Sequence, residues 1–496
     1  MTITIIGLGP GDPDLLTRRA WQTLHDAPEV YLRTARHPGV GDLPHAEMYH
    51  DFDAWYDSAE SFEVLYDRIA AEIVRLGARP EGITYAVPGH PLVGESTVTR
   101  ILALAKAHTL PVEIVIVEGL SFIEPTLSAL GLDGLDGLQL LDAVEIGRLH
   151  HPSLNPDVPA LLAQVYSQAV ASDVKLTLSN QYPDEHEVTL LHGAGTANPL
   201  IEIVPLYEID RSPHISHLTS LYVPPLPVAG SFERFQETIA HLRAPEGCPW
   251  DQKQTHQSLR KYLLEETYEA LAALDADDPD SLKEELGDLL LQIVLQTQIA
   301  TEAGEFRMAD VIEGINSKII RRHPHVWGTA EAADADAVTV NWEQIKRAER
   351  AATQSDEKAE AQKSMLDSIP ATLPALMVAN LYGERSSRVG FDWPSIEATF
   401  AKVQEEIAEV QSAPDEDSRA KELGDVLFSV AQWIRHYGAE PETVLREANG
   451  RWAARFRYIE RHAGDDLGKL SADQLEALWQ AAKREEMAQQ EQATNS

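Results

Sequence analysis

A duplicated acidic pattern constrains this 496-residue chain more than any other feature of its sequence. The segments LLEETYEAL and KEELGDLLLQIVL, at 263–295, are echoed by VQEEIAEV and AKELGDVLFSVAQ at 403–432. Each copy reads E-E-x-x-E, a spacer, and then E-x-x-D. The offset of roughly 140 residues is that of a whole domain present twice, because a solenoid unit would recur every 20–50 residues.

The acidic positions of each copy are predicted to converge. Successive residues of an α-helix lie about 100° apart, so Glu265, Glu266 and Glu269 share one helical face. Glu285 and Asp288 share a face of the next helix. Two antiparallel helices then bring up to five carboxylates to one spot. The corresponding positions of the second copy are Glu405, Glu406, Glu409, Glu422 and Asp425.

A carboxylate cluster of this kind indicates a metal site. Several carboxylates cannot ionise together in a confined site without opposing charge, and hard divalent cations prefer oxygen ligands. We expect Mg²⁺ first and Mn²⁺ second. The alternative is a solvated acidic helix face, which is common in acidic chains. Leu286 and Leu289 beside Glu285 and Asp288 favour the metal, since carboxylates bordering an apolar stripe are costly unless paired or bound.

Glycine occupies the same slot between the last two acids of both copies, at Gly287 and Gly424. Within a helix, glycine costs about 1 kcal/mol relative to alanine. We therefore expect close approach of another helix or of a ligand at these positions.

The first 225 residues have a different pattern. Short β-rich runs alternate with helical patterns, which predicts an α/β domain with ligand sites at the strand ends. The expected strands are TITII at the start, ITYAV from Ile83, VEIVIV from Val112, VKLTL from Val174 and EVTLL from Glu187. A Pro/Gly hinge, VPPLPVAG, then leads into helical sequence. The predicted domains are 1–225, 231–350 and 370–487, with a polar linker at 351–369.

The amino-acid composition argues against two classes of binding partner, nucleic acids and membranes. Lys and Arg number 41 against 79 Asp and Glu, a net charge of −38. Such a field repels phosphate backbones and anionic membrane surfaces, so neither nucleic acid nor membrane is an expected partner. The single cysteine, Cys248, and the absence of a leader-like N-terminus or a long apolar run predict a cytoplasmic protein.

The acidic pattern closely resembles that of the MazG family of all-α nucleoside triphosphate pyrophosphohydrolases. CPWDQKQTH at 248–256 and INSKIIRRHPHVW at 315–327 are also similar to MazG sequences. The resemblance implies Mg²⁺-dependent cleavage of a nucleoside triphosphate between its α and β phosphates, giving a monophosphate and pyrophosphate. It also implies a homodimer formed through the helical domains.

The roles that we expect for the acids follow from this chemistry. The expected metal ligands are Glu266, Glu269, Glu285 and Asp288 in the first copy, and Glu406, Glu409, Glu422 and Asp425 in the second. Glu265, and Glu405 in the second copy, would bind metal or help to take the proton of the attacking water. Which carboxylate is the base is left open, so Glu265, Glu266, Glu269, Glu405, Glu406 and Glu409 are all catalytic candidates.

Cleavage of a triphosphate also requires cations, because negative charge spreads over the phosphoryl oxygens. The phosphate-binding candidates are Lys318, Arg321 and Arg322 in the first copy and Arg451 and Arg455 in the second. Ala454 stands where the first copy has Arg321. The alternative is that these cations pair with nearby surface acids.

The opening GLGPGDPDLLT follows the first predicted strand but is not a dinucleotide fingerprint, because Asp12 stands in place of the third glycine. Together with PGHP at 88–91 and VEGLSFIEPTLSALGL at 117–132, it resembles the tetrapyrrole (corrin and porphyrin) methylase family. The resemblance implies a two-lobed α/β domain that holds S-adenosylmethionine (SAM) in its cleft. The residues that it implies at that cleft are Gly9, Pro10, Gly11, Asp12, Gly89, His90, Pro91 and Ser121.

His90 departs from the pattern of the corrin methylases, which usually have an acid there, and this argues against corrin as the methyl acceptor. The order of the parts resembles that of YabN-type fusion proteins. The expected fold is thus a two-lobed methylase-like α/β domain followed by two all-α MazG-like helical bundles. Two alternatives stay open: a SAM-dependent methyltransferase whose helical domains serve assembly or regulation, and a SAM-sensing module that regulates a hydrolase.

Overall fold

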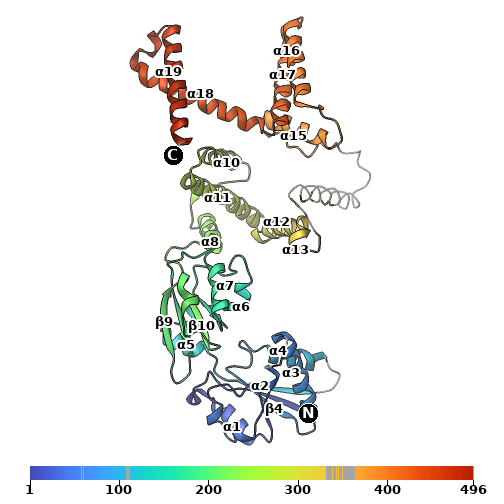
Figure 1. Cartoon of the computed structure of the whole chain (residues 1–496), viewed down its shortest axis with the longest axis vertical. Helices are drawn as coiled ribbons and strands as arrows, with labels where there is room; N and C mark the ends of the chain where they lie inside the picture. The colour runs from blue at the N-terminus through green and yellow to red at the C-terminus, as the bar shows by residue number, and fades with distance from the viewer. Residues whose placement is uncertain are drawn as a thin grey trace. The chain divides into compact units, whose positions relative to one another are not determined.

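The computed structural model describes residues 1–56, 58–59, 61–107, 112–330 and 364–494, together with the single residues 334, 338, 342, 345 and 349. The chain forms two compact units, Met1–Gln254 and Thr255–Ser496, and each is described by itself. The first unit is α/β and the second is helical (Figure 1). Residues 351–363 of the predicted linker lie outside the described residues.

The first lobe of the α/β unit is built on a parallel five-stranded sheet. Its strands, in spatial order, are β3 (His50–Asp51), β2 (Val30–Leu32), β4 (Ile83–Val87), β1 (Thr2–Gly7) and β5 (Glu113–Val117). The helices of this lobe are α1 (Arg18–Asp26), α2 (Asp53–Tyr56), α3 (Phe62–Gly77), α4 (Ser96–Ala107) and α5 (Ile123–Leu130). Ile3 and Ile5 of β1 pack with α3 and α4, while Ile6 packs with α1. Helices therefore cover both faces, as a parallel sheet requires.

The second lobe has a mixed five-stranded sheet. Its spatial order is β6 (Gln139–Asp142), β7 (Ala160–Ala163), β10 (Thr219–Val223), β8 (Glu187–His192) and β9 (Leu200–Pro205). Only the β6–β7 pair is parallel. Two helices, α6 (Ala143–Gly147) and α7 (Gln168–Leu178), pack against each other beside this sheet.

The strand expected at 174–178 is wrong, because these residues belong to α7. Ser167 accepts a hydrogen bond from the backbone N–H of Val170 and so caps the start of the helix. Val170, Val174 and Leu178 are buried at a spacing of four residues, which is a helical period. The β-branched composition of VKLTL obscured that period. The other four expected strands are confirmed as β1, β4, β5 and β8.

The α/β unit ends with α8 (Phe232–Arg243) and α9 (Pro249–Gln252). Asp157 fixes the start of α8, since its carboxylate accepts hydrogen bonds from the backbone N–H groups of Gly230 and Ser231 and from the Ser231 hydroxyl. The compact first unit thus reaches past the Pro/Gly hinge and includes the first helix after it.

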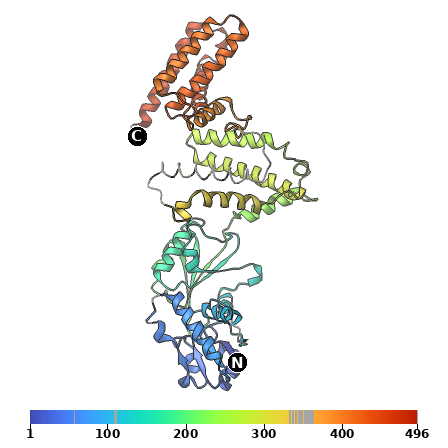
Figure 2. The same ribbon diagram turned by 90° about the vertical axis from the view of Figure 1, so that its right-hand side faces the viewer.

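The helical unit repeats a hairpin of two packed helices, as the sequence predicts (Figures 1 and 2). The first hairpin is α10 (Arg260–Asp275) with α11 (Pro279–Ala303), and the second is α16 (Ile396–Ser412) with α17 (Glu416–His436). The remaining helices are α12 (Met308–Arg322), α13 (Pro324–Trp327), α15 (Ala375–Ser387), α18 (Pro441–Ala463) and α19 (Ala472–Thr494). Asp278 and Asp415 cap the second helix of each hairpin through backbone N–H groups.

The close helix approach expected at Gly287 and Gly424 is not found within the described part of the chain. A Cβ atom added at either glycine would meet no described atom within 4 Å. Within the described part of one chain, packing therefore does not offset the loss of helix stability that a mid-helix glycine causes. Among the described helices, none is long and apolar enough to cross a membrane.

Candidate functional site

The first carboxylate cluster joins the two helices of the first hairpin. Glu266 comes from α10, while Glu285 and Asp288 come from α11. One carboxylate oxygen of each lies within 4.8 Å of those of the other two, and all three side chains are half-buried. We call these three residues the first trio. The predicted facing arrangement of the two motifs is thus observed for three of the five acids.

Burial and neighbouring negative charges disfavour ionisation of two acids of the first trio. Burial raises the pKa of Glu266, and the negative charges of Asp288, Glu269 and Glu265 raise it further. Burial and the charges of Glu269 and Asp288 raise the pKa of Glu285. A divalent cation relieves such repulsion, so the donor set and its charge fit a hard metal ion.

The second hairpin presents a matching cluster. Carboxylate oxygens of Glu406 and Glu409 from α16 and of Glu422 from α17 lie within 4.8 Å of one another. We call these the second trio. Burial and the charges of Glu406 and Glu422 raise the pKa of Glu409. Asp425, which is exposed, is not a member of this trio.

A lysine distinguishes the second trio from the first. Lys402 Nζ lies 2.8 Å from Glu406 and 2.9 Å from Glu405, and these two hydrogen bonds raise the pKa of Lys402. Counting back from the E-E-x-x-E motif, Tyr262 holds this position in the first copy. A phenol carries no positive charge, so the two copies differ by one internal cation next to the acids.

The predicted phosphate-binding arginines are paired with acids. Arg321 Nε lies 2.7 Å from Glu349 Oε1, and Arg322 Nη2 lies 2.7 Å from Glu349 Oε2. These bonds, that of Arg322 foremost, lower the pKa of Glu349 to about 2. Lys318 is exposed on α12.

The second copy repeats this pairing. Arg455 Nε lies 2.7 Å from Glu486 Oε2, and Arg451 lies 3.7 Å from Glu447. Among the described residues, no ion pair joins any of the predicted phosphate-binding cations to either trio.

Sequence reasoning missed Glu349, Glu486 and Lys402. A signal for the two glutamates was present, because WEQIKRAE at 342–349 and WQAAKREE at 479–486 repeat each other. Lys402 precedes its motif by three residues, but many surface lysines stand near acids, and only the structure shows this one against Glu406.

In the α/β unit, the three loops expected to hold SAM meet at the carboxyl ends of β1, β4 and β5. The backbones of Gly9 and Gly89 exchange two hydrogen bonds, of 3.2 and 2.7 Å. A Cβ on Gly7 would lie 2.4 Å from Gly89 O and 2.8 Å from Gly119 N. Only glycine permits this contact. The loops that carry Gly9, Pro10, Gly11, Asp12, Gly89, His90, Pro91 and Ser121 are therefore brought together.

Side chains within these loops are largely engaged by the protein itself. Ser121 Oγ donates to Glu124 and accepts from the Ile123 N–H. His90 Nδ1 accepts from the Leu92 N–H. His37 is buried against this loop, with Nε2 donating to Gly9 O at 3.0 Å, and burial lowers its pKa. A ligand bound at these loops would therefore contact mainly backbone atoms.

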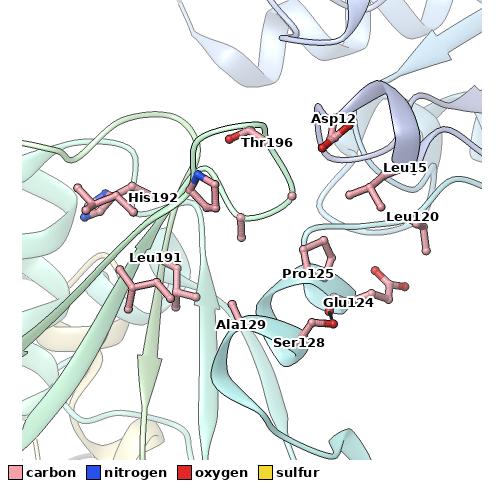
Figure 3. A pocket seen from close by; sticks show the side chains of 15 residues that line it. Asp12, Leu15, Leu120, Glu124, Pro125, Ser128, Ala129, Leu191, His192 and Thr196 are labelled. Carbon is pink, nitrogen blue, oxygen red and sulfur yellow. Dashed lines mark hydrogen bonds between the residues drawn. The ribbon is translucent and has the colours of Figure 1, made fainter.

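A pocket of about 460 Å³ lies between the two lobes of this unit (Figure 3). Asp12, Leu15 and residues of α5 line one side, and Leu191, His192 and the loop at 194–196 line the other. Asp12 N–H donates to Gly195 O and links the two sides. Of the eight predicted SAM residues, Asp12 alone lines this pocket.

Two family models match the chain. The model for tetrapyrrole (corrin/porphyrin) methylases matches residues 2–210, and that for the MazG nucleotide pyrophosphohydrolase domain matches residues 254–327. The second match contains the first trio. The fold and these sites thus define a fusion of a tetrapyrrole methylase domain with a MazG region.

Similar proteins agree with this architecture. The uncharacterized protein YabN of Bacillus subtilis is 40% identical over 496 residues, which cover 98% of this chain and 99% of that protein. The chain therefore belongs to the YabN family. The nucleoside triphosphate pyrophosphohydrolase of Escherichia coli K12 is 41% identical over 264 residues, covering 51% of this chain and 98% of that protein.

Among solved structures, the uroporphyrin-III-C-methyltransferase from Thermus thermophilus has a TM-score of 0.36 at 22% identity. The match covers 45% of this chain and 94% of that one.

Proposed function

We propose that the helical unit is a Mg²⁺-dependent nucleoside triphosphate pyrophosphohydrolase that releases a monophosphate and pyrophosphate. The observation that carries this proposal is the first trio, in which Glu266, Glu285 and Asp288 meet within 4.8 Å. Three carboxylates at this separation offer the hard oxygen ligands of Mg²⁺. A bound ion would make a water more acidic and offset the charge of the phosphates.

The relatives support the same assignment. The proteins of Escherichia coli and Thermotoga maritima that are named nucleoside triphosphate pyrophosphohydrolases are 41% and 40% identical over about half of this chain. Both alignments, of 264 and 255 residues, exceed one copy of the duplicated domain. Glu269 and Glu265, whose charges reach Glu266, are the remaining candidates for a metal ligand and for the base.

The test is pyrophosphate release from a panel of NTPs and dNTPs by the full chain, with and without Mg²⁺. We expect Mg²⁺-dependent release that is lost when Glu266→Gln is combined with Glu406→Gln, the matching members of the two trios. Glu284→Gln is the matched control, because it removes the same charge from an exposed residue beside Glu285. Unchanged turnover in the double variant would refute the metal-site assignment.

The α/β unit is proposed to bind SAM and to transfer its methyl group to a small-molecule acceptor. The observation that favours this function is the convergence of the Gly9, Gly89 and Gly119 loops, since methyl transfer from a sulfonium depends chiefly on alignment. Titration calorimetry of SAM into the full chain is expected to show saturable heat. The absence of heat at millimolar SAM would exclude both the methyltransferase and the SAM-sensing reading.

We further propose that the helical unit pairs with a second copy of this chain. Leu286, Leu290 and Ile293 on α11 are exposed beside the first trio, and α12 exposes an apolar stripe of Ile312, Ile315 and Ile319. Helices with unburied apolar stripes commonly complete a bundle by association. The single cysteine, which is unpaired, agrees with a cytoplasmic location.

A further inference from the structure

A glutamine on α11 has a buried oxygen atom without a partner. Gln292 is 5% exposed, and its Oε1 is enclosed but accepts no hydrogen bond from any described residue. A buried acceptor that stays unpaired is costly, because it has lost its water and gained no other donor. A ligand that supplies the missing donor would offset this cost.

Other buried polar side chains on the two matching helices do have partners. Thr297 of α11, which is also 5% exposed, donates to a backbone carbonyl of its own helix at 2.8 Å. Gln432 of α17 is fully buried, donates to Ala379 O at 2.6 Å and accepts from Arg435 Nε at 2.8 Å. Gln292 therefore departs from the way in which these helices satisfy their buried polar groups.

Gln292 lies on the same face of α11 as two acids of the first trio. Glu285 and Asp288 precede it by seven and four residues. At about 100° per residue, the three side chains fall within about 60° around the helix axis, and Asp288 is about 6 Å away along that axis. The unpaired acceptor thus lies one turn beyond the proposed metal site, on the face that carries its ligands.

The chemistry of the missing donor indicates which part of a nucleotide could supply it. Ionised phosphate oxygens are hydrogen-bond acceptors and have nothing to donate to Gln292 Oε1. A nucleoside, in contrast, has hydroxyl groups on its ribose and N–H groups on its base. The unpaired oxygen therefore suits the nucleoside, which is the part of the substrate that a metal ion does not recognise.

The second copy has a different residue at this position. Ser429 stands four residues after Asp425, as Gln292 does after Asp288, and it is 3% exposed. A serine hydroxyl is shorter than a glutamine side chain and has a donor of its own. The two copies therefore differ in the buried polar group that follows their acids by one turn.

We propose that Gln292 is a specificity-determining residue of the first copy, whose Oε1 accepts a hydrogen bond from a ribose hydroxyl or a base N–H of the bound nucleotide. This inference rests on the proposed function, because it takes the first trio to hold a nucleoside triphosphate through its metal ion. Gln292 itself binds neither the metal nor the phosphates.

The test is titration calorimetry with Mg²⁺ on the full chain carrying Glu406→Gln, which disables the second trio. The probes are α,β-methylene analogues of ATP, GTP, CTP and UTP, which resist cleavage between the α and β phosphates, and inorganic tripolyphosphate, which lacks a nucleoside. In Gln292→Met we expect the Kd of the tightest-binding analogue to rise about tenfold, the effect of one lost hydrogen bond. The Kd of tripolyphosphate is expected to stay within about twofold, since phosphates offer Gln292 no donor.

Two further measurements separate this role from a structural one. Gln292→Met removes an unpaired acceptor at similar volume, so the midpoint of thermal unfolding is not expected to fall. Thr297→Val is the matched control, because it removes a buried polar group of equal exposure from the same helix, about 180° around the axis from Asp288. It is expected to leave both dissociation constants unchanged.

Three results would overturn the proposal. They are an unchanged Kd of the analogue in Gln292→Met, an equal rise in the Kd of tripolyphosphate, and no binding of any analogue before Gln292 is changed. An equal rise for tripolyphosphate would show that Gln292 acts through the metal or the phosphates.

A 2′,3′-dideoxy form of the same analogue distinguishes the two donors. If the effect of Gln292→Met persists with this form, the donor is a base N–H, and if the effect disappears, the donor is a ribose hydroxyl. Either result supports the contact. Binding of the analogues by a chain whose unaltered form hydrolyses no nucleotide is a separate result, which would reject the proposed reaction and not the contact.

Discussion

At the residue scale, Lys402 is the main chemical difference between the two carboxylate trios. Its ammonium group forms ion pairs with Glu405 and Glu406, and Glu406 is itself a member of the second trio. A metal ion bound at the second trio, as proposed, would compete with this cation for the same oxygens. The first trio has Tyr262 at the matching position and faces no such competition from that side chain.

We therefore predict that Lys402→Met raises the Mn²⁺ affinity of the second copy by up to about fivefold. This factor corresponds to the free energy that a partly exposed ion pair contributes. Tyr262→Lys is expected to lower the affinity of the first copy by a similar factor. Titration of the full chain with Mn²⁺, followed by electron paramagnetic resonance, measures both changes. Equal affinities in the parent chain and in Lys402→Met would contradict this account of the two copies.

A buried ion pair joins the end of β2 to the start of α4. Arg33 at the end of β2 lies 3.0 Å from Glu95, whose side chain is 2% exposed, and also donates to Tyr56 and Tyr66. Removal of one partner leaves an unpaired buried charge, so Arg33→Met is expected to lower the free energy of unfolding by about 3 kcal/mol. Urea denaturation measures the loss. A smaller loss in Arg33→Met with Glu95→Leu would confirm the pairing as its origin.

At the element scale, the glycines of α11 and α17 can show whether a second copy of the chain packs against these helices. Gly287 and Gly424 are exposed, and a Cβ at either position would touch no described atom of the chain. We predict that each change to alanine stabilises the fold by about 1 kcal/mol, because alanine is the better helix former. Thermal unfolding monitored by circular dichroism measures this effect. A fall in stability would indicate that a second copy packs against these positions.

The elements differed in how far sequence could predict them. The hairpins α10–α11 and α16–α17 follow from helical periodicity and are confirmed, since Glu266 and Glu285 meet as the spacing requires. The segment at 174–178 was misread because β-branched composition outweighed the four-residue spacing of its buried side chains. The ion pairs of Arg322 with Glu349 and of Arg455 with Glu486 were missed because the partners lie 27 and 31 residues apart. The repeat of WEQIKRAE in WQAAKREE marks the two glutamates but does not indicate which arginines they bind.

At the scale of the whole molecule, the apolar stripe of α12 predicts self-association. Ile312, Ile315 and Ile319 are each at least 40% exposed, which is unfavourable for three side chains on one face. We predict that the chain sediments as a dimer in analytical ultracentrifugation and that Ile315→Asp shifts it toward monomer. Glu313→Gln, a change on the same helix outside this stripe, is the control. A monomeric parent chain at micromolar concentration would exclude this interface.

The two units also differ in how they present their sites. In the α/β unit the site is shaped by backbone, as at Gly7, Gly89 and Gly119, so its loops could be found from glycine-rich motifs. The pocket beside these loops could not be predicted from the motifs, because residues at 191–201 of the second lobe also line it. In the helical unit the chemistry lies in charged side chains, and their spacing alone revealed the acids but not their partners.

The identity of the reaction products tests the central claim most directly. A ³¹P NMR spectrum of a nucleoside triphosphate incubated with the full chain and Mg²⁺ is predicted to show the monophosphate and pyrophosphate, with neither product formed when Mg²⁺ is chelated. Accumulation of a diphosphate with orthophosphate, or product formation that persists without the metal, would contradict the account of these carboxylate trios.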